Sequence, residues 1–184
     1  MLSQRVGIGF DIHRTKKGLA ILLGGVRIPS DFALEGHSDA DVLLHAVTDA
    51  LLGAAGLGDI GEMFPDDDPM NLGRDSAEML TEAYQLIKKN NWRIANIDCT
   101  IIAESPRLGH HKLDIRGRIA ELLKVSSDRV NIKAKTAEKL GAVGRNEAIA
   151  AQCVVLLEQK PETRPKLLEM AQSETLSVEL HDLE

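Results

Sequence analysis

The order of apolar and polar positions along the chain predicts a mixture of strands and helices. Runs rich in Val and Ile predict strands, whereas apolar residues three or four positions apart predict amphipathic helices. The predicted strands are RVGIGF (5–10), LAILLGGVRIP (19–29, one strand or a hairpin that bends at Gly24–Gly25), WRIANIDCTIIAE (92–104), RVNIKAKT (129–136) and EAIAAQCVVLLEQ (147–159). The predicted helices are 38–56, 74–91 and 112–125. The order lacks strict strand–helix–strand repetition, so we expect an α+β sandwich, with one mixed sheet and helices packed on one face.

The remaining segments are polar and are predicted as loops. They are DFALEGHSDADV (31–42), in which the first helix begins, and the segments 57–73, 105–111 and 137–146. Ser38 and Asp41 resemble a capping box in which Asp replaces the usual Glu or Gln. This spacing predicts that the first helix begins at Ser38.

The length and composition indicate one domain. A chain of 184 residues with 43% hydrophobic and 27% charged residues is large enough for one core and too short for two large ones. We assign this domain to residues 1–159. The segment 160–184 contains two prolines and is acidic, and it is predicted to be a loosely attached tail. The alternative is a helix or strand docked on a partner subunit.

Charge and apolar content exclude several kinds of partner. The net charge is −6 and aromatic residues make up 3% of the chain, which argues against nucleic-acid binding. No apolar run approaches the ~20 residues that a membrane span requires. The N-terminus has no signal-peptide pattern, so we expect a soluble, cytoplasmic protein. Cys99 and Cys153 lie in apolar runs without metal-finger spacing and are predicted to be buried, reduced thiols.

The segment GFDIH carries the first candidate chemistry. Asp11 and His13 are two positions apart, so in a strand they share one face and form either a two-ligand clamp for a divalent metal or a half-buried ion pair. Adding His45 gives three ligands, a pattern typical of a catalytic zinc site with an open position. Asp49, one turn after His45, is predicted to accept the second imidazole N–H. The alternative is that the acid and first histidine cap a strand and that His45 is half-buried and satisfied.

Two further segments suggest ligand binding. LGDIGEMFPDDD places Asp59 and Gly61 where a carboxylate and open backbone can hold sugar hydroxyls, although a solvated acidic loop has the same composition. KAKTAEKLGAVGR offers cations, a hydroxyl and a carboxylate suited to phosphate and Mg²⁺, and an ordinary surface loop is the alternative. Its candidate residues are Lys135, Thr136, Glu138, Lys139 and Arg145.

Several common motifs are absent. GIG (7–9) begins like a dinucleotide-binding fingerprint, but Ile12 occupies the third glycine's position and no helix signal follows. The sequence contains no Gly-x-Ser-x-Gly, HExxH or Walker motif. The chain therefore shows no signature of a nucleotide-dependent oxidoreductase, a serine hydrolase or a P-loop enzyme.

Taken in order, the motifs identify a family. GFDIH, LGGVRIP, GHSDADVLLHAVTDALLGAAGLGDIGEMFPDDDP, DSAEML, KAKTAEKLGAVGR and EAIAAQCVVLL occur at close to family spacing. Together they resemble the 2-C-methyl-D-erythritol 2,4-cyclodiphosphate synthases, homotrimeric enzymes of the non-mevalonate isoprenoid pathway. The resemblance covers about residues 5–158.

The resemblance implies a role for each matching position. It implies Zn²⁺ ligands at Asp11, His13 and His45, and an Mg²⁺ or Mn²⁺ ion held by Glu138 and the substrate diphosphate. It implies catalytic positions at His37, Ser38, Lys135, Thr136 and Glu138. It also implies that substrate contacts come from the loop 103–108, which binds cytosine, and from other positions. The implied substrate-binding residues are Asp11, His13, His37, Ser38, Asp59, Gly61, Asp66, Ala103, Arg107, Leu108, Thr136 and Arg145. Lys135 and Ala137 depart from the pattern, because many relatives carry threonine there.

The reaction implied by the resemblance is an intramolecular phosphoryl transfer. The substrate would be 4-diphosphocytidyl-2-C-methyl-D-erythritol 2-phosphate, and CMP would leave as a cyclic diphosphate closes. Active sites of the family lie between subunits, so we expect an obligate homotrimer. Two alternatives use the same residues: a zinc phosphodiesterase, which needs a metal-bound water as nucleophile, and a metal-stabilised trimeric binding module without catalysis.

Overall fold

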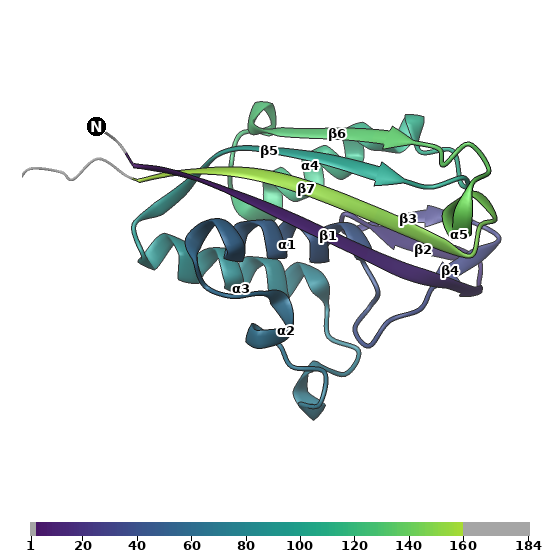
Figure 1. The fold of residues 1–184 in the computed structure, drawn as a ribbon, viewed down its shortest axis with the longest axis horizontal. Helices are drawn as coiled ribbons and strands as arrows, with labels where there is room; N and C mark the ends of the chain where they lie inside the picture. Colours follow the sequence, from purple (N-terminus) through teal and green to yellow (C-terminus); the bar gives the residue numbers. More distant parts are fainter. Residues whose placement is uncertain (1–2, 160–184) are drawn as a thin grey trace, which may run out of the picture.

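The computed structural model of the protein describes residues 3–159 and shows a sheet covered by helices (Figure 1). The five-stranded sheet has the order β4-β1-β7-β5-β6. Only β5 and β6 are parallel, so the sheet is mixed. Its strands are β1 (Gln4–Lys17), β4 (Phe32–Leu34), β5 (Trp92–Ile102), β6 (Val130–Lys135) and β7 (Ala148–Gln159). A separate hairpin is formed by β2 (Ala20–Leu23) and β3 (Val26–Pro29).

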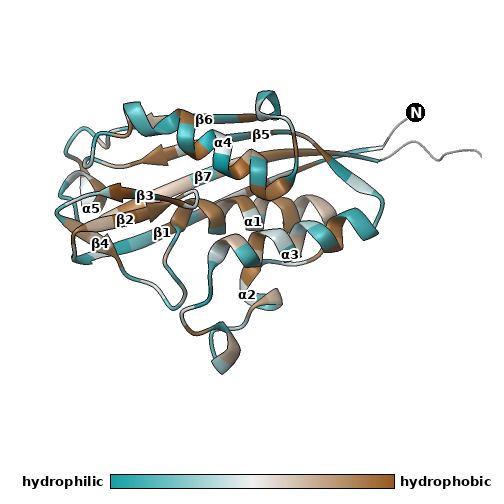
Figure 2. Ribbon diagram, turned by 180° about the vertical axis from the view of Figure 1, so that it is seen from behind, coloured by the Kyte–Doolittle hydropathy of each residue, from teal (hydrophilic) through white to brown (hydrophobic). Residues whose placement is uncertain are grey.

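The three long helices lie on the same side of the sheet. They are α1 (Val42–Ala55), α3 (Ser76–Lys89) and α4 (Lys112–Leu123). The shorter helices are α2 (Ile60–Met63), α5 (Gly141–Gly144) and the 3-10 turns η1 (Pro69–Asn71), η2 (Gly109–His111) and η3 (Ser127–Arg129). Hydrophobic residues concentrate in α1 and the strands, whereas α3 and α4 alternate between hydrophilic and hydrophobic turns (Figure 2). The expected α+β fold, with one mixed sheet and helices, is confirmed. No described helix is long and apolar enough to cross a membrane.

Close contact between α1 and β1 depends on two glycines. A Cβ atom on Gly7 would lie 2.0 Å from the carbonyl oxygen of Ala50, and one on Gly9 would lie 2.0 Å from that of Ala46. Without side chains at these positions, the alanine face of α1 lies directly on the strand. This contact brings the first turn of α1 beside residues 11–13 of β1.

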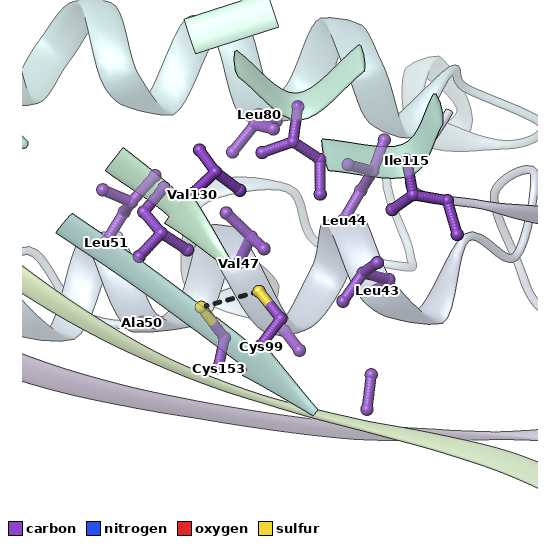
Figure 3. Close-up of a cluster of buried hydrophobic side chains, with 14 of the residues drawn as sticks. Leu43, Leu44, Val47, Ala50, Leu51, Leu80, Cys99, Ile115, Val130 and Cys153 are labelled. Carbon is purple, nitrogen blue, oxygen red and sulfur yellow. Dashed lines mark hydrogen bonds between the residues drawn. The ribbon is translucent and has the colours of Figure 1, made fainter. Parts of the chain in front are cut away.

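The core lies between α1 and the sheet and extends to α3 and α4 (Figure 3). Leu43, Leu44 and Leu51 of α1 are fully buried. Cys99 and Cys153 face each other across β5 and β7, with 3.6 Å between their sulfur atoms. Both are buried free thiols, as the sequence predicts.

The opposite face of β1 is apolar and exposed. Side chains alternate across a strand, so the residues between the glycines point away from α1. Val6, Ile8, Phe10 and Ile12 are 48% to 68% exposed. The single strand β1 therefore has one face in the core and one face open in this chain.

Two predicted boundaries are wrong. β1 continues to Lys17 instead of ending at residue 10, because it pairs with β7 as far as Arg14 and with β4 beyond. The first helix does not begin at Ser38. Its N-cap is Asp41, whose carboxylate accepts the N–H groups of Leu43 and Leu44. Ser38 instead points its hydroxyl at a histidine, as described below.

Several short elements occur where the sequence predicts only loops. β4 lies within 31–42, α2 and η1 lie within 57–73, and α5 lies within 137–146. Each contains only three or four residues, too few to show a hydrophobic period. The predicted tail, 160–184, lies outside the described residues.

Candidate metal centre and substrate cavities

β1 and α1 bring one carboxylate and two imidazoles together. Asp11 Oδ2 lies 3.0 Å from His13 Nε2 and 2.9 Å from His45 Nδ1. The two imidazole nitrogens are 3.0 Å apart. The three ligand types predicted from the sequence therefore meet at one point, although they come from residues 34 positions apart.

The ligand atoms are suited to a divalent metal. His13 Nδ1 donates to the carbonyl oxygen of Glu35 at 2.7 Å, which leaves Nε2 with its lone pair toward the cluster. Burial raises the pKa of the Asp11 carboxyl, but its contacts with the imidazoles of His13 and His45 outweigh burial and hold that pKa well below its usual range. The carboxylate is thus in the ionised form that binds metals.

The second nitrogen of His45 does not contact Asp49, so that prediction is wrong. His45 Nε2 lies 2.8 Å from Ser76 Oγ and 3.0 Å from Ser38 Oγ. Asp49 Oδ1 instead accepts the N–H of Ile60 at 2.8 Å and anchors the start of α2. The partner Ser76 is 31 residues away in sequence, and no local spacing reveals it.

The cluster opens into a cavity of about 220 Å³, called here the histidine cavity. Among the residues predicted as substrate contacts, it brings together Asp11, His13, His37, Ser38, Gly61 and Asp66. Asp59 is absent from this lining and caps α2 by accepting the N–H of Glu62 at 2.8 Å. The cavity is also lined by Ile60, Phe64, Asn71 and Met79, which no motif or spacing in the sequence predicts.

A second cavity of about 150 Å³ lies at the ends of β5 and β6 and is called here the loop cavity. It is lined by Ala103, Glu104, Pro106, Arg107, Leu108, Gly109, Lys112, Ala134, Lys135 and Thr136. Within residues 3–159, it shares no lining residue with the histidine cavity. The predicted cytosine residues and the predicted Lys135 and Thr136 therefore occupy one place, apart from the metal cluster.

Three predicted residues remain: Glu138 and Arg145 have side-chain partners, and the backbone N–H of Lys139 donates to the Glu104 carboxylate at 3.3 Å. Glu138 Oε1 accepts the hydroxyl of Thr136 at 2.5 Å. Arg145 makes two bonds to the Glu147 carboxylate, at 2.8 and 2.9 Å. A phosphate bound by Arg145 would have to share it with Glu147.

The donor set fits a zinc ion. Ligand atoms of a tetrahedral zinc site lie roughly 3.3 Å apart, and the three atoms here are 2.9 to 3.0 Å apart. Small side-chain shifts would open the cluster enough for the ion. The fourth position would face the histidine cavity, as in catalytic zinc sites.

Fold and site together define an α+β protein with a candidate metal centre between a sheet and its central helix. The chain matches the YgbB family over residues 4–158 and belongs to it. It is 52% identical over 156 residues to the 2-C-methyl-D-erythritol 2,4-cyclodiphosphate synthase of Geobacillus sp. (strain WCH70). The aligned residues make up 85% of this chain and 99% of that protein.

Solved structures agree with this assignment. The bifunctional IspDF of Campylobacter jejuni superimposes with a TM-score of 0.85 at 41% identity, over 89% of this chain and 44% of that chain. A CDP complex of IspF from Plasmodium falciparum has a TM-score of 0.76 at 36% identity, over 86% of this chain and 97% of that chain. The family named from motifs alone is confirmed.

Proposed function

We propose that the protein is a cyclodiphosphate synthase of isoprenoid biosynthesis. It converts 4-diphosphocytidyl-2-C-methyl-D-erythritol 2-phosphate into 2-C-methyl-D-erythritol 2,4-cyclodiphosphate and CMP. The observation that carries this proposal is the convergence of Asp11, His13 and His45 beside a cavity lined by His37 and Ser38, in a chain of this family.

The reaction needs no protein nucleophile. An oxygen of the substrate's 2-phosphate forms a bond to the β-phosphorus, and the bond from that phosphorus to the bridging oxygen breaks. CMP leaves with that oxygen and its electron pair. The protein's task is to hold two anionic groups in line, which is worth up to roughly 7–11 kcal/mol in well-oriented reactions. This is the division of labour expected for phosphoryl transfer.

Each group in the site has a separate task. Zn²⁺ held by Asp11, His13 and His45 would supply Lewis-acid charge stabilisation. His37 and Ser38 contact the phosphate and diol of the substrate at the wall of the histidine cavity. Asp59, Gly61 and Asp66 belong to the segment that holds the methylerythritol part, with Asp59 acting through the start of α2.

The loop cavity provides the nucleotide contacts. Backbone groups of 103–108 bind the cytosine edge, and Arg107 lies beside them. Thr136 and Lys135 would contact the diphosphate, and Glu138 would help to hold an Mg²⁺ or Mn²⁺ ion that stabilises its charge. The CDP complex of the Plasmodium falciparum relative supports a cytidine diphosphate ligand for this chain.

The active protein is proposed to be a homotrimer. One chain keeps the histidine cavity and the loop cavity apart, and a single substrate must reach both its metal and its cytosine contacts. The exposed apolar face of β1 supplies the surface that a second copy would bury. Neighbouring subunits would thus complete each site.

Phosphorus NMR of the purified protein with Mg²⁺ and the cytidine substrate tests the reaction. Two cyclic-diphosphate signals and CMP are expected, lost after zinc removal and restored by added Zn²⁺. Linear phosphate products would indicate a phosphodiesterase instead. An unchanged substrate in the presence of bound zinc would leave a metal-stabilised binding module.

A further inference from the structure

His45 belongs to a chain of polar contacts that leads away from the metal. Its Nε2 atom lies 2.8 Å from Ser76 Oγ, and the Ser76 hydroxyl donates to Asp39 Oδ1. The other oxygen, Asp39 Oδ2, accepts the backbone N–H of Ser76 at 3.1 Å. A carboxylate, a hydroxyl and an imidazole therefore follow one another toward the cluster.

These contacts join two segments that are distant in sequence. The N–H of Gly73 donates to the carbonyl oxygen of His37 at 2.9 Å, and the N–H of Asp39 donates to that of Arg74 at 3.2 Å. Ser76, the first residue of α3, is 1% exposed. The start of α3 is thus fastened to the segment that precedes α1.

The number of available protons fixes the direction of each bond. A serine hydroxyl has one proton, and an ionised carboxylate only accepts. Because Ser76 gives its proton to Asp39, its oxygen can only accept from His45 Nε2. That nitrogen must then carry the imidazole proton, which leaves the lone pair on Nδ1, the atom that faces Asp11 and His13.

Ser38 alone would not impose this tautomer. Its oxygen is 3.0 Å from His45 Nε2 and accepts only a weak bond, at 3.4 Å from Ala40 N. Its hydroxyl can donate to His45 Nε2 or to Ser76 Oγ, 3.5 Å away, or accept from the imidazole, so Ser38 does not fix the direction of its bond to His45. Ser76 differs from Ser38 because of Asp39.

We propose that Asp39 and Ser76 are positioning residues that hold His45 in the tautomer that binds metal. The inference rests on the zinc centre of the proposed function but not on the reaction itself. The start of α3 thereby acts on the metal site without contacting the metal. In many metal sites, a residue that does not contact the metal fixes the tautomer of a histidine ligand through a hydrogen bond. Loss of such a partner typically weakens metal binding by about 10- to 100-fold.

The test uses the full chain and two measurements that do not depend on turnover. Nitrogen-15 NMR of the imidazole rings in zinc-free protein at alkaline pH reports which nitrogen of His45 is protonated. Competition with a chelating dye reports the zinc affinity. The variants are Ser76→Ala, Ser76→Thr, Asp39→Asn and the double variant Asp39→Asn/Ser76→Ala. Thr81→Val is the matched control, because the Thr81 hydroxyl is also on α3 but donates to Ala77 at 2.8 Å.

We expect wild type to show the proton on Nε2 of His45. Ser76→Ala should give a mixture of tautomers and about tenfold weaker zinc binding, whereas Ser76→Thr and Thr81→Val should behave like wild type. Asp39→Asn should weaken zinc binding in the wild-type background and have no further effect once Ser76 is absent, because it acts through that hydroxyl.

Three results would overturn the inference. One is an unchanged tautomer and zinc affinity in Ser76→Ala. Another is a loss from Asp39→Asn that is equally large with and without Ser76. The third is a wild-type protein that binds no zinc. If zinc binding changes as expected but no cyclic diphosphate forms, only the proposed reaction fails.

Discussion

Asp41 joins the first helix to the β2–β3 hairpin. Its buried carboxylate accepts the N–H groups of Leu43 and Leu44 at the start of α1, and those of Gly24 and Gly25 at the hairpin turn. Burial opposes its charge and raises the pKa of the carboxyl, and the N–H groups of Gly25, Leu44 and Gly24 offset only part of that rise. One side chain therefore fixes where the helix that carries a metal ligand begins.

Replacing Asp41 by alanine should destabilise the protein strongly. The change leaves several buried N–H groups without an acceptor and removes the cap of α1, so we expect a loss of about 3 kcal/mol. Denaturant unfolding measures it. Asp41→Asn keeps one acceptor oxygen and should lose clearly less. Equal losses in the two variants would contradict this account of the carboxylate.

Zinc should stabilise the protein through His45. A ligand that binds only the folded state adds about 2.7 kcal/mol when its concentration is 100 times its dissociation constant. Thermal unfolding with and without a chelator should show this gain in wild type and its absence in His45→Ala. His110→Ala, an exposed histidine outside the cluster, is the control. A zinc-dependent shift that persists in His45→Ala would place the ion elsewhere.

Single residues could be predicted as far as local spacing reaches. Asp11 and His13 are predictable because a strand places alternate residues on one face. The partner of His45 Nε2 could not be predicted in this way. Asp49 is the candidate close in sequence, whereas the actual partner, Ser76, comes from the next long helix. Helix spacing allows a contact between His45 and Asp49, but tertiary packing places Ser76 beside His45 instead.

The contact between α1 and β1 sets the depth of the metal centre. Gly7 and Gly9 let the helix backbone approach the strand, and every residue of α1 except His45, Asp49 and Gly53 is buried. His45 and Asp49 lie one turn apart and both face the histidine cavity. A bulkier strand would push the helix, and His45 with it, away from Asp11.

A methyl group at Gly9 should therefore be costly. The added Cβ would meet the backbone of α1, and overpacking of this kind costs about 1–3 kcal/mol or more. Gly9→Ala should lower stability by this amount and also weaken zinc binding. Gly53→Ala is the matched control on α1, since nothing beyond the adjacent residues and backbone of α1 lies within 4 Å of the added Cβ. It should gain about 0.5–1 kcal/mol, as expected for helical glycine replaced by alanine.

If Gly9→Ala were as stable as wild type, the close approach of α1 to β1 at Gly9 would not be needed for stability. The two variants are compared by denaturant unfolding and dye competition for zinc. Together they separate the contact of a strand with a helix from the general effect of adding a methyl group.

Long elements were predicted better than short ones. α3 spans Ser76–Lys89 where a helix over 74–91 was predicted, and β7 ends at Gln159 as expected. β1 was predicted too short because residues 11–17 are polar except for Ile12, and Asp11 and His13 among them belong to the metal site. Strand pairing with β7 outweighs this change in composition.

The whole molecule presents an apolar strip on the face of β1 opposite α1. Val6, Ile8, Phe10 and Ile12 form it, and Val154 of β7 lies in the same exposed layer at 40% exposure. Exposed apolar patches of this kind mark association surfaces. Sequence alternation shows that the large apolar residues of β1 share one face, but it does not show that another copy covers that face.

A charge in this strip should prevent assembly. Phe10→Asp places an unpaired carboxylate where the proposed trimer would bury apolar surface, so sedimentation should show monomers, whereas we expect a trimer for wild type. Activity should be lost while zinc still binds, because Asp11 and His13 face the other way. Leu113→Asp, at an exposed leucine on α4, should leave the trimer intact. A trimeric Phe10→Asp protein would place the interface elsewhere.

Because β1 serves two purposes with alternate residues, its length cannot change by a single residue. One inserted or deleted position between Gly7 and His13 would turn the ligands outward and the apolar strip inward. Single-codon insertions and deletions are therefore closed to evolution in this stretch. A protein engineer who lengthens this strand should add residues two at a time, outside the stretch that α1 covers.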